Sequence, residues 1–236
     1  MLALLLATHF FYPEKAALAR YDFLTIAAFA IQVAMLWLRL ESWEEAKVIL
    51  IFHIVGTVME LFKTANGSWI YPEDSILRIG GVPLFSGFMY AAVGSYIARV
   101  LRIFYFRFSN YPTRSYTFGL AIAVYINFFA HHWFPDIRLA LFAIMGLLFW
   151  RTRIWFRVWG EYRWMPLIVG QFLVATFIWF AENIGTFARA WSYPSQQSGW
   201  HMVSPSKLGA WLLLMYISFV LVSLVNKPKS LETQRI

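Results

Sequence analysis

The residues of this chain that could carry chemistry are carboxylates and histidines inside apolar segments. Glu60 and Glu182 each lie near the end of a long apolar run, and His53 precedes Glu60 by seven residues, on the same helix face. A charged side chain within a membrane span costs about 2.5–3.5 kcal/mol, so it needs a partner or a purpose. A carboxyl group beside a histidine suits general acid–base catalysis. Lys63 leaves open the alternative that Glu60 only forms an ion pair at a helix end.

Both carboxylates belong to a repeated sequence pattern. Residues 60–72 and 182–194 share the pattern Glu-x3-Thr-x4-Trp-x-Tyr-Pro, ungapped and 122 positions apart. The same offset relates His9 to His131, and both precede a proline and a carboxylate. This correspondence predicts an internal duplication.

Aromatic and amide side chains complete the candidate site. Tyr71 and Tyr193 are expected to hydrogen-bond over an apolar ligand. The alternative is an architectural role, because Trp and Tyr favour the membrane–water interface and Pro turns a helix. The candidate catalytic residues are His53, Glu60, His131 and Glu182. The candidate substrate-binding residues are Trp69, Tyr71, Asn127, Asn183, Trp191 and Tyr193.

A metal site is a further alternative for the same side chains. Neutral histidine with carboxylate suits Zn, Fe or Mn, and the ligands would be His53, Glu60, His131 and Glu182. The sequence lacks the His-x2-His and His-x3-His spacings, the zincin motif, a Gly-rich phosphate loop and a serine nucleophile elbow. No cofactor is therefore predicted, and a divalent metal remains the alternative.

The composition places these residues in a membrane protein. Of the 236 residues, 60% are hydrophobic and 14% are charged, whereas soluble domains are about 45–50% apolar and about 25% charged. The net charge is +8, but the basic residues lie between apolar runs, which indicates lipid headgroups and topology rather than nucleic acid. The absence of cysteine excludes disulfides and thiolate metal sites.

Apolar segments predict the elements that position the site. They cover residues 1–12, 22–40, 46–64, 82–104, 116–134, 138–156, 164–187 and 207–226. The first is shorter than the roughly 20 residues that a span needs. We therefore expect an all-α polytopic transmembrane bundle of seven to eight spans, forming a single domain. The 122-residue offset maps the first four segments onto the last four, which predicts two parallel four-span repeats over about 1–114 and 115–236.

The loop charges predict the orientation. Thirteen Lys and Arg residues lie on one side of this topology and seven on the other, with the strongest bias in loops 99–114 and 151–163. This favours a multi-pass protein of the cell inner membrane with both termini in the cytoplasm. Both copies of the repeated pattern then lie on the non-cytoplasmic side, where they could share one cleft.

The chain also resembles a known family. Residues 53–96 contain His53-x6-Glu60, Trp69-Ile-Tyr71-Pro72 and Gly81-Val-Pro-Leu-Phe-Ser-Gly-Phe-Met-Tyr90. With residues 127–138 and 182–216, this stretch resembles an uncharacterised bacterial integral membrane family, domain of unknown function 817. The His-x6-Glu helix, the aromatic-Tyr turn and Gly-Val-Pro-Leu are also similar to membrane carotenoid hydratases and bacterial lycopene cyclases. That second resemblance implies an acid at Glu60 or Glu182, supported by His53, and no redox cofactor.

These observations predict a membrane enzyme, a lyase/hydratase or an isomerase/cyclase. It would act on an isoprenoid- or lipid-like substrate by acid–base chemistry at double bonds. Its partners would be membrane lipid and the hydrophobic substrate, with no nucleic acid. A small-molecule or ion transporter is the first alternative. A metal-dependent membrane enzyme and a non-catalytic membrane protein are the others.

Overall fold

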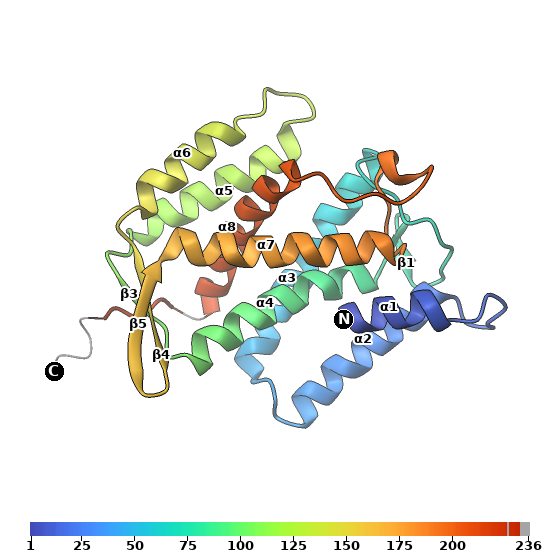
Figure 1. The fold of residues 1–236 in the computed structure, drawn as a ribbon, viewed down its shortest axis with the longest axis horizontal. Helices are drawn as coiled ribbons and strands as arrows, with labels where there is room; N and C mark the ends of the chain where they lie inside the picture. Colours follow the sequence, from blue (N-terminus) through green and yellow to red (C-terminus); the bar gives the residue numbers. More distant parts are fainter. Residues whose placement is uncertain (226, 232–236) are drawn as a thin grey trace. The chain divides into compact units, whose positions relative to one another are not determined.

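The computed structural model describes residues 1–225 and 227–231, and this part of the chain is mostly helical (Figure 1). Its α-helices are α1 Leu2–Phe11, α2 Arg20–Trp37, α3 Trp43–Ala65, α4 Phe85–Ile103, α5 Arg114–Ala130, α6 Arg138–Phe149, α7 Leu167–Phe187 and α8 Ser206–Val225. Within the described residues, α3, α7 and α8 are long and apolar enough to cross a membrane. A helical membrane protein is thus supported, while the expected seven to eight spans and the repeat stay predictions.

Two small sheets show that the all-α expectation was incomplete. One contains β1 Arg78–Ile79 and β2 Val82–Pro83, and the other contains β3 Arg107–Ser109, β4 Arg153–Val158 and β5 Glu161–Pro166. Two-residue turns join β1 to β2 and β4 to β5. The turn residues Gly80-Gly81 and Trp159-Gly160 all have positive φ angles, between 54° and 91°. This is the turn geometry that the strand twist favours.

The expected apolar span over residues 138–156 is therefore divided. Helix α6 ends at Phe149, and strand β4 begins at Arg153. An apolar run such as Ile154–Phe156 fits a buried strand as well as a helix, so hydrophobicity alone cannot separate the two. The type of element was wrong for the last part of this segment.

The chain forms two compact units, each drawn from both halves of the expected repeat. The first unit contains residues 1–95 and 179–204, and the second contains residues 96–178 and those from 205 onward.

Glycines let α3 and α4 approach closely in the first unit. A Cβ atom on Gly56 would lie 2.6 Å from Cγ of Tyr90, and one on Gly87 would lie 2.5 Å from Cε1 of His53. Both distances are shorter than a carbon–carbon contact allows. The small residues are therefore needed to bring Tyr90 against α3.

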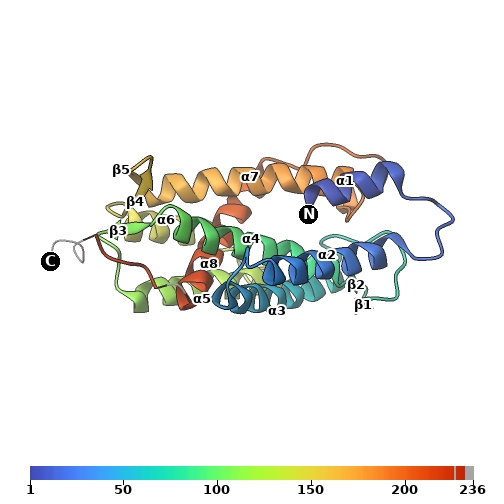
Figure 2. The same cartoon turned by 90° about the horizontal axis from the view of Figure 1, so that it is seen from below.

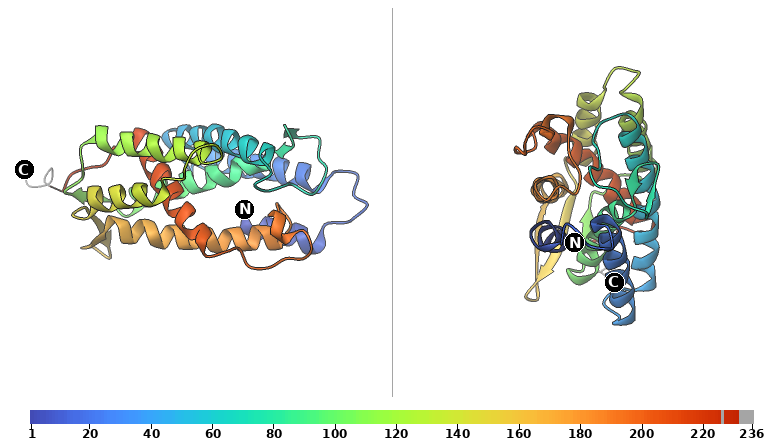
Figure 3. Two further views of the ribbon diagram at one scale, coloured as in Figure 1. Left: turned by 90° about the horizontal axis from the view of Figure 1, so that it is seen from above. Right: turned by 90° about the vertical axis from the view of Figure 1, so that its right-hand side faces the viewer.

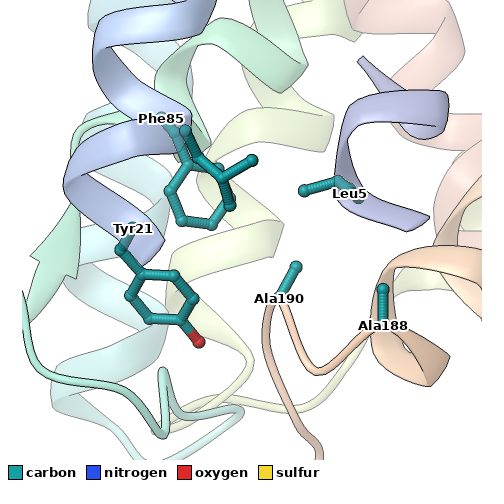
Figure 4. Close-up of a cluster of buried hydrophobic side chains, with 6 residues drawn as sticks. Leu5, Tyr21, Phe85, Ala188 and Ala190 are labelled. Carbon is teal, nitrogen blue, oxygen red and sulfur yellow. The ribbon is translucent and has the colours of Figure 1, made fainter. Parts of the chain in front are cut away.

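A small apolar core lies beside these helices in the first unit (Figure 4). Its buried members are Leu5, Tyr21, Leu24, Phe85, Ala188 and Ala190. The Tyr21 hydroxyl donates a hydrogen bond of 3.0 Å to the Arg189 carbonyl. The core thus fixes the chain where it leaves α7.

In the second unit, α5 lies beside α6 and α8 (Figure 1). The Tyr216 hydroxyl of α8 donates to the Thr117 carbonyl of α5 over 2.7 Å. The segment after α8 reaches β3, where the Phe108 amide donates to the Lys229 carbonyl over 2.9 Å (Figure 2).

Candidate functional site

Glu60, near the C-terminal end of α3, accepts hydrogen bonds from three neutral side chains. Its Oε2 accepts from Nε1 of Trp69 over 2.7 Å and from the Tyr71 hydroxyl over 2.6 Å. Its Oε1 accepts from the Tyr90 hydroxyl over 2.8 Å. The residue is only 4% exposed, so these donors replace water around the carboxylate.

Glu182, in α7, also accepts a hydrogen bond from a tyrosine of its own copy of the repeated pattern. It is 3% exposed and accepts a hydrogen bond from the Tyr193 hydroxyl. In both copies of the repeated pattern, the glutamate therefore binds the tyrosine eleven residues later.

The backbone turns in the same way after both helices. Gly67 and Arg189, at corresponding positions, have φ angles of 66° and 53°. The Ser68 amide donates to the Lys63 carbonyl over 2.9 Å, and the Ala190 amide donates to the Gly185 carbonyl over 3.0 Å. This left-handed helix end returns the Trp-x-Tyr segment toward its own glutamate.

The two Trp-x-Tyr segments pair with each other. Ile70 and Ser192, the middle residues of the two copies, exchange two backbone hydrogen bonds of 2.9 Å in an antiparallel bridge. The Trp69 ring lies edge-on to Tyr193, with centroids 6.2 Å apart. Figure 3 shows the loop after α7 that carries Tyr193 and the short 3-10 helix Pro194–Gln196. Contacts thus run from Glu60 through Trp69 and Tyr193 to Glu182, which joins the two carboxyl groups in one buried cluster.

The tyrosines in these loops are kept neutral as hydrogen-bond donors. Burial, followed by the charge of Glu60, raises the pKa of Tyr71 well above its ordinary value. Burial, followed by the charge of Glu182, raises the pKa of Tyr193 in the same direction. Both phenols therefore stay neutral and can donate to a carboxylate throughout the neutral range.

Three other candidates of the first unit have different surroundings. The His53 ring lies against Gly87 and 4.8 Å from the Phe88 ring. Trp191 covers Gly185 and packs against the apolar core. The Asn183 amide donates to the Trp179 carbonyl and accepts from the Val203 amide, both over 2.8 Å, so it fastens the loop to α7.

Asn127 and His131 belong to the second unit, at the end of α5. Oδ1 of Asn127 accepts from the Ile137 amide over 3.2 Å, and its Nδ2 donates to Asp136 over 3.0 Å. Nδ1 of His131 lies 2.9 Å from the Asn127 carbonyl oxygen. These contacts shape the connection between α5 and α6.

The sequence analysis did not place Tyr90, the third donor to Glu60, among the candidate site residues. A tyrosine hydroxyl inside an apolar segment could have indicated Tyr90. The contact between Tyr90 and Glu60, however, depends on the close approach of α3 and α4. In the described part of the chain, no three or more His, Cys, Asp or Glu side chains gather into a group that could hold a metal ion.

Comparison with protein families places the chain among related sequences. The family model described as "Protein of unknown function (DUF817)" matches residues 1–219. The "Uncharacterized protein YoaT" of Bacillus subtilis (strain 168) is 42% identical over 212 residues, which are 90% of this chain and 80% of that protein.

Solved structures with a similar fold include a mycobacterial Insig homologue, MvINS from Mycobacterium vanbaalenii. The TM-score is 0.54 at 14% identity, and the match covers 80% of this chain and 98% of that one. A cross-linked trimer of MvINS gives the same TM-score over 79% of this chain and 95% of that one. At this identity the similarity concerns the fold alone.

Proposed function

We infer the activity of this chain from its own site, because the chain belongs to the family described as Protein of unknown function (DUF817), as its resemblance predicted. We propose that it is a membrane enzyme that performs general acid–base chemistry on a hydrophobic substrate. The observation that carries this proposal is the pair of buried carboxyl groups, Glu60 and Glu182, joined through Trp69 and Tyr193.

The chemistry fits an isoprenoid- or lipid-like alkene. A protonated carboxyl group would transfer its proton to one alkene carbon and leave a cation on the other. Water could then add to the cation and lose a proton to a carboxylate, which gives a hydrate. Loss of a neighbouring C–H proton would instead give an isomer or a ring. Both routes return the proton and need no redox cofactor.

The hydrogen bonds around the pair suit this role. When a carboxyl group gives up its proton, its new charge is stabilised by donors that already point at it, such as Tyr71 and Tyr90 on Glu60. Tyr193 does the same for Glu182. In this proposal, His53, in the same helix as Glu60, orients the reacting groups of the first unit.

Conservative substitutions test the proposal in cells that lack their own copy of the gene. Membrane lipid extracts would be compared by untargeted mass spectrometry after complementation with wild type, Glu60→Gln or Glu182→Gln. General acid–base groups contribute about 10²–10⁴-fold. Each variant should therefore lower the wild-type-dependent product by about 100-fold or more.

Glu44→Gln is the matched control, because Glu44 lies in the same helix as Glu60 and its side chain is 59% exposed in an ion pair with Lys47. It should keep the wild-type product level. Normal product levels with both Glu60→Gln and Glu182→Gln would disprove the proposal.

Transport is the second candidate, and Gln171 of α7 favours it. This residue is 3% exposed, and among the described residues neither polar atom of its amide has a hydrogen-bond partner. A buried amide without hydrogen-bond partners could donate to, or accept from, a solute that crosses the membrane. Solute flux into proteoliposomes that is lost with Gln171→Leu, and kept with Glu182→Gln, would favour transport over catalysis.

A further inference from the structure

The sheet of the second unit has one face of arginine and aromatic residues. The register places Arg107 opposite Trp155, Trp155 opposite Trp164, and Arg157 opposite Tyr162. Side chains two residues apart in a strand point to the same face, so Arg153 joins them. We name this set the basic sheet face: Arg107, Arg153, Trp155, Arg157, Tyr162 and Trp164.

The basic sheet face is the outward one. Phe108 and Ile154, which alternate with its members, are 3% and 6% exposed and belong to the core. Arg153, Arg157 and Trp164 are exposed. Among the residues of the three described strands, the one carboxylate is Glu161, and it lies opposite Val158 on the other face. The outward face therefore carries three arginines and, among the described strand residues, no carboxylate.

Contacts within the face hold Arg153, Trp155 and Trp164 in place. The Arg153 guanidinium lies 4.0 Å from the centroid of the Trp164 ring, in a cation–π contact. Nε1 of Trp155 donates to the Ser109 hydroxyl over 3.0 Å. A guanidinium held in this way can bind phosphate oxygens with two hydrogen bonds.

The position of the sheet at the start of α7 favours a membrane lipid as its binding partner. Strand β5 ends at Pro166, and α7, one of the candidate membrane spans, begins at Leu167. The Leu167 amide also donates to the Thr152 carbonyl over 2.9 Å, which ties the base of the hairpin to the start of this helix. A sheet fixed at the end of a span lies at the level of the lipid headgroups.

The tip of the hairpin supports the same partner. Trp159 is 98% exposed in the turn between β4 and β5. Tryptophan favours the membrane–water interface, and arginines near a membrane surface are attracted by anionic lipids. We propose that the basic sheet face binds the phosphate headgroups of anionic phospholipids, with Trp159 inserted at the same interface.

Binding of a fluorescent short-chain phosphatidylglycerol to the full-length protein in a neutral detergent tests this proposal, with the matching phosphatidylcholine as the uncharged comparison. Wild type should bind phosphatidylglycerol more tightly, and added salt should reduce the difference. Arg157→Gln should weaken phosphatidylglycerol binding about fivefold, and Arg107→Gln with Arg153→Gln and Arg157→Gln should weaken it on the order of 100-fold.

Arg163→Gln is the matched control, since Arg163 is an exposed arginine of the same hairpin whose partner, Phe156, places it on the opposite face. It should bind phosphatidylglycerol like wild type. Arg157→Lys should keep most of the affinity and show that charge, not folding, is lost in Arg157→Gln. Equal binding of the two lipids, or equal losses with Arg157→Gln and Arg163→Gln, would overturn the proposal.

Discussion

At the scale of single residues, the Glu60 carboxylate accepts hydrogen bonds from three neutral side chains, those of Trp69, Tyr71 and Tyr90. Each oxygen of a buried carboxylate needs hydrogen bonds, because water no longer supplies them. Three neutral side chains provide these hydrogen bonds. The arrangement stabilises the carboxylate and keeps neutral phenols in position to donate hydrogen bonds when the charge on Glu60 changes.

Replacing one of these donors should destabilise the protein. Tyr71→Phe keeps the ring but removes the hydroxyl that donates to Glu60 over 2.6 Å. Leaving a buried acceptor without its donor costs about 1–3 kcal/mol, so the free energy of unfolding in detergent should fall by about this amount. The control is Tyr116→Phe, because Tyr116 is 67% exposed. Equal midpoints for the two variants in thermal unfolding would contradict this assignment.

At the scale of elements, the end of α7 is shaped by the absence of a side chain at Gly185. A Cβ atom there would lie 2.2 Å from the Trp191 ring. The glycine therefore lets Trp191 fold back over its own helix, and this return places Tyr193 within reach of Glu182.

Two glycine substitutions should change stability in opposite directions. Alanine is usually better than glycine in a helix by about 1 kcal/mol, so Gly146→Ala in α6, where no atom lies within 4 Å of the added carbon, should be neutral or stabilising. Gly185→Ala should instead destabilise by about 1–3 kcal/mol through overpacking. Thermal unfolding of both variants measures the difference, and a stabilised Gly185→Ala protein would show that Trp191 does not pack there.

The connection between α5 and α6 should depend on pH. Burial alone would raise the pKa of Asp136, but hydrogen bonds from Asn127 and from the Arg138 amide, with the charge of Arg138, lower it overall. A carboxyl group whose pKa is lower in the folded state stabilises that state above its unfolded pKa, about 3.9. This contribution is lost as the pH falls below that value through the folded pKa.

Thermal unfolding from about pH 6 down to about pH 3 measures this loss. Wild type should lose stability more steeply than Asp136→Asn, because the variant lacks the titrating group. Parallel curves for the two proteins would show that Asp136 does not contribute in this way.

At the scale of the whole molecule, the apolar segments of the sequence predicted where most of the helical residues lie, since hydrophobic length is the main requirement for a span. The repeated pattern also identified Glu60, Tyr71, Glu182 and Tyr193, whose contacts the structure shows. A membrane segment tolerates few polar residues, so those present were conspicuous.

Other features depend on contacts that no local pattern contains. Strand β4 arises from an apolar run that fits a helix equally well, and its pairing with β3 joins residues 46 positions apart, as in the bond from Trp155 to Ser109. Tyr90 and the Ile70–Ser192 bridge likewise depend on tertiary packing. Hydrophobicity locates such segments, but it does not choose their partners.

In the proposed function, Glu60 and Glu182 act as one acid–base pair. The most direct test is the rate of product formation in membranes that carry Glu60→Gln, Glu182→Gln or both substitutions. Residues that act as a unit are not additive, so the double variant should be about as slow as the slower single variant. Multiplied losses in the double variant would contradict the pair, as would single variants with wild-type rates.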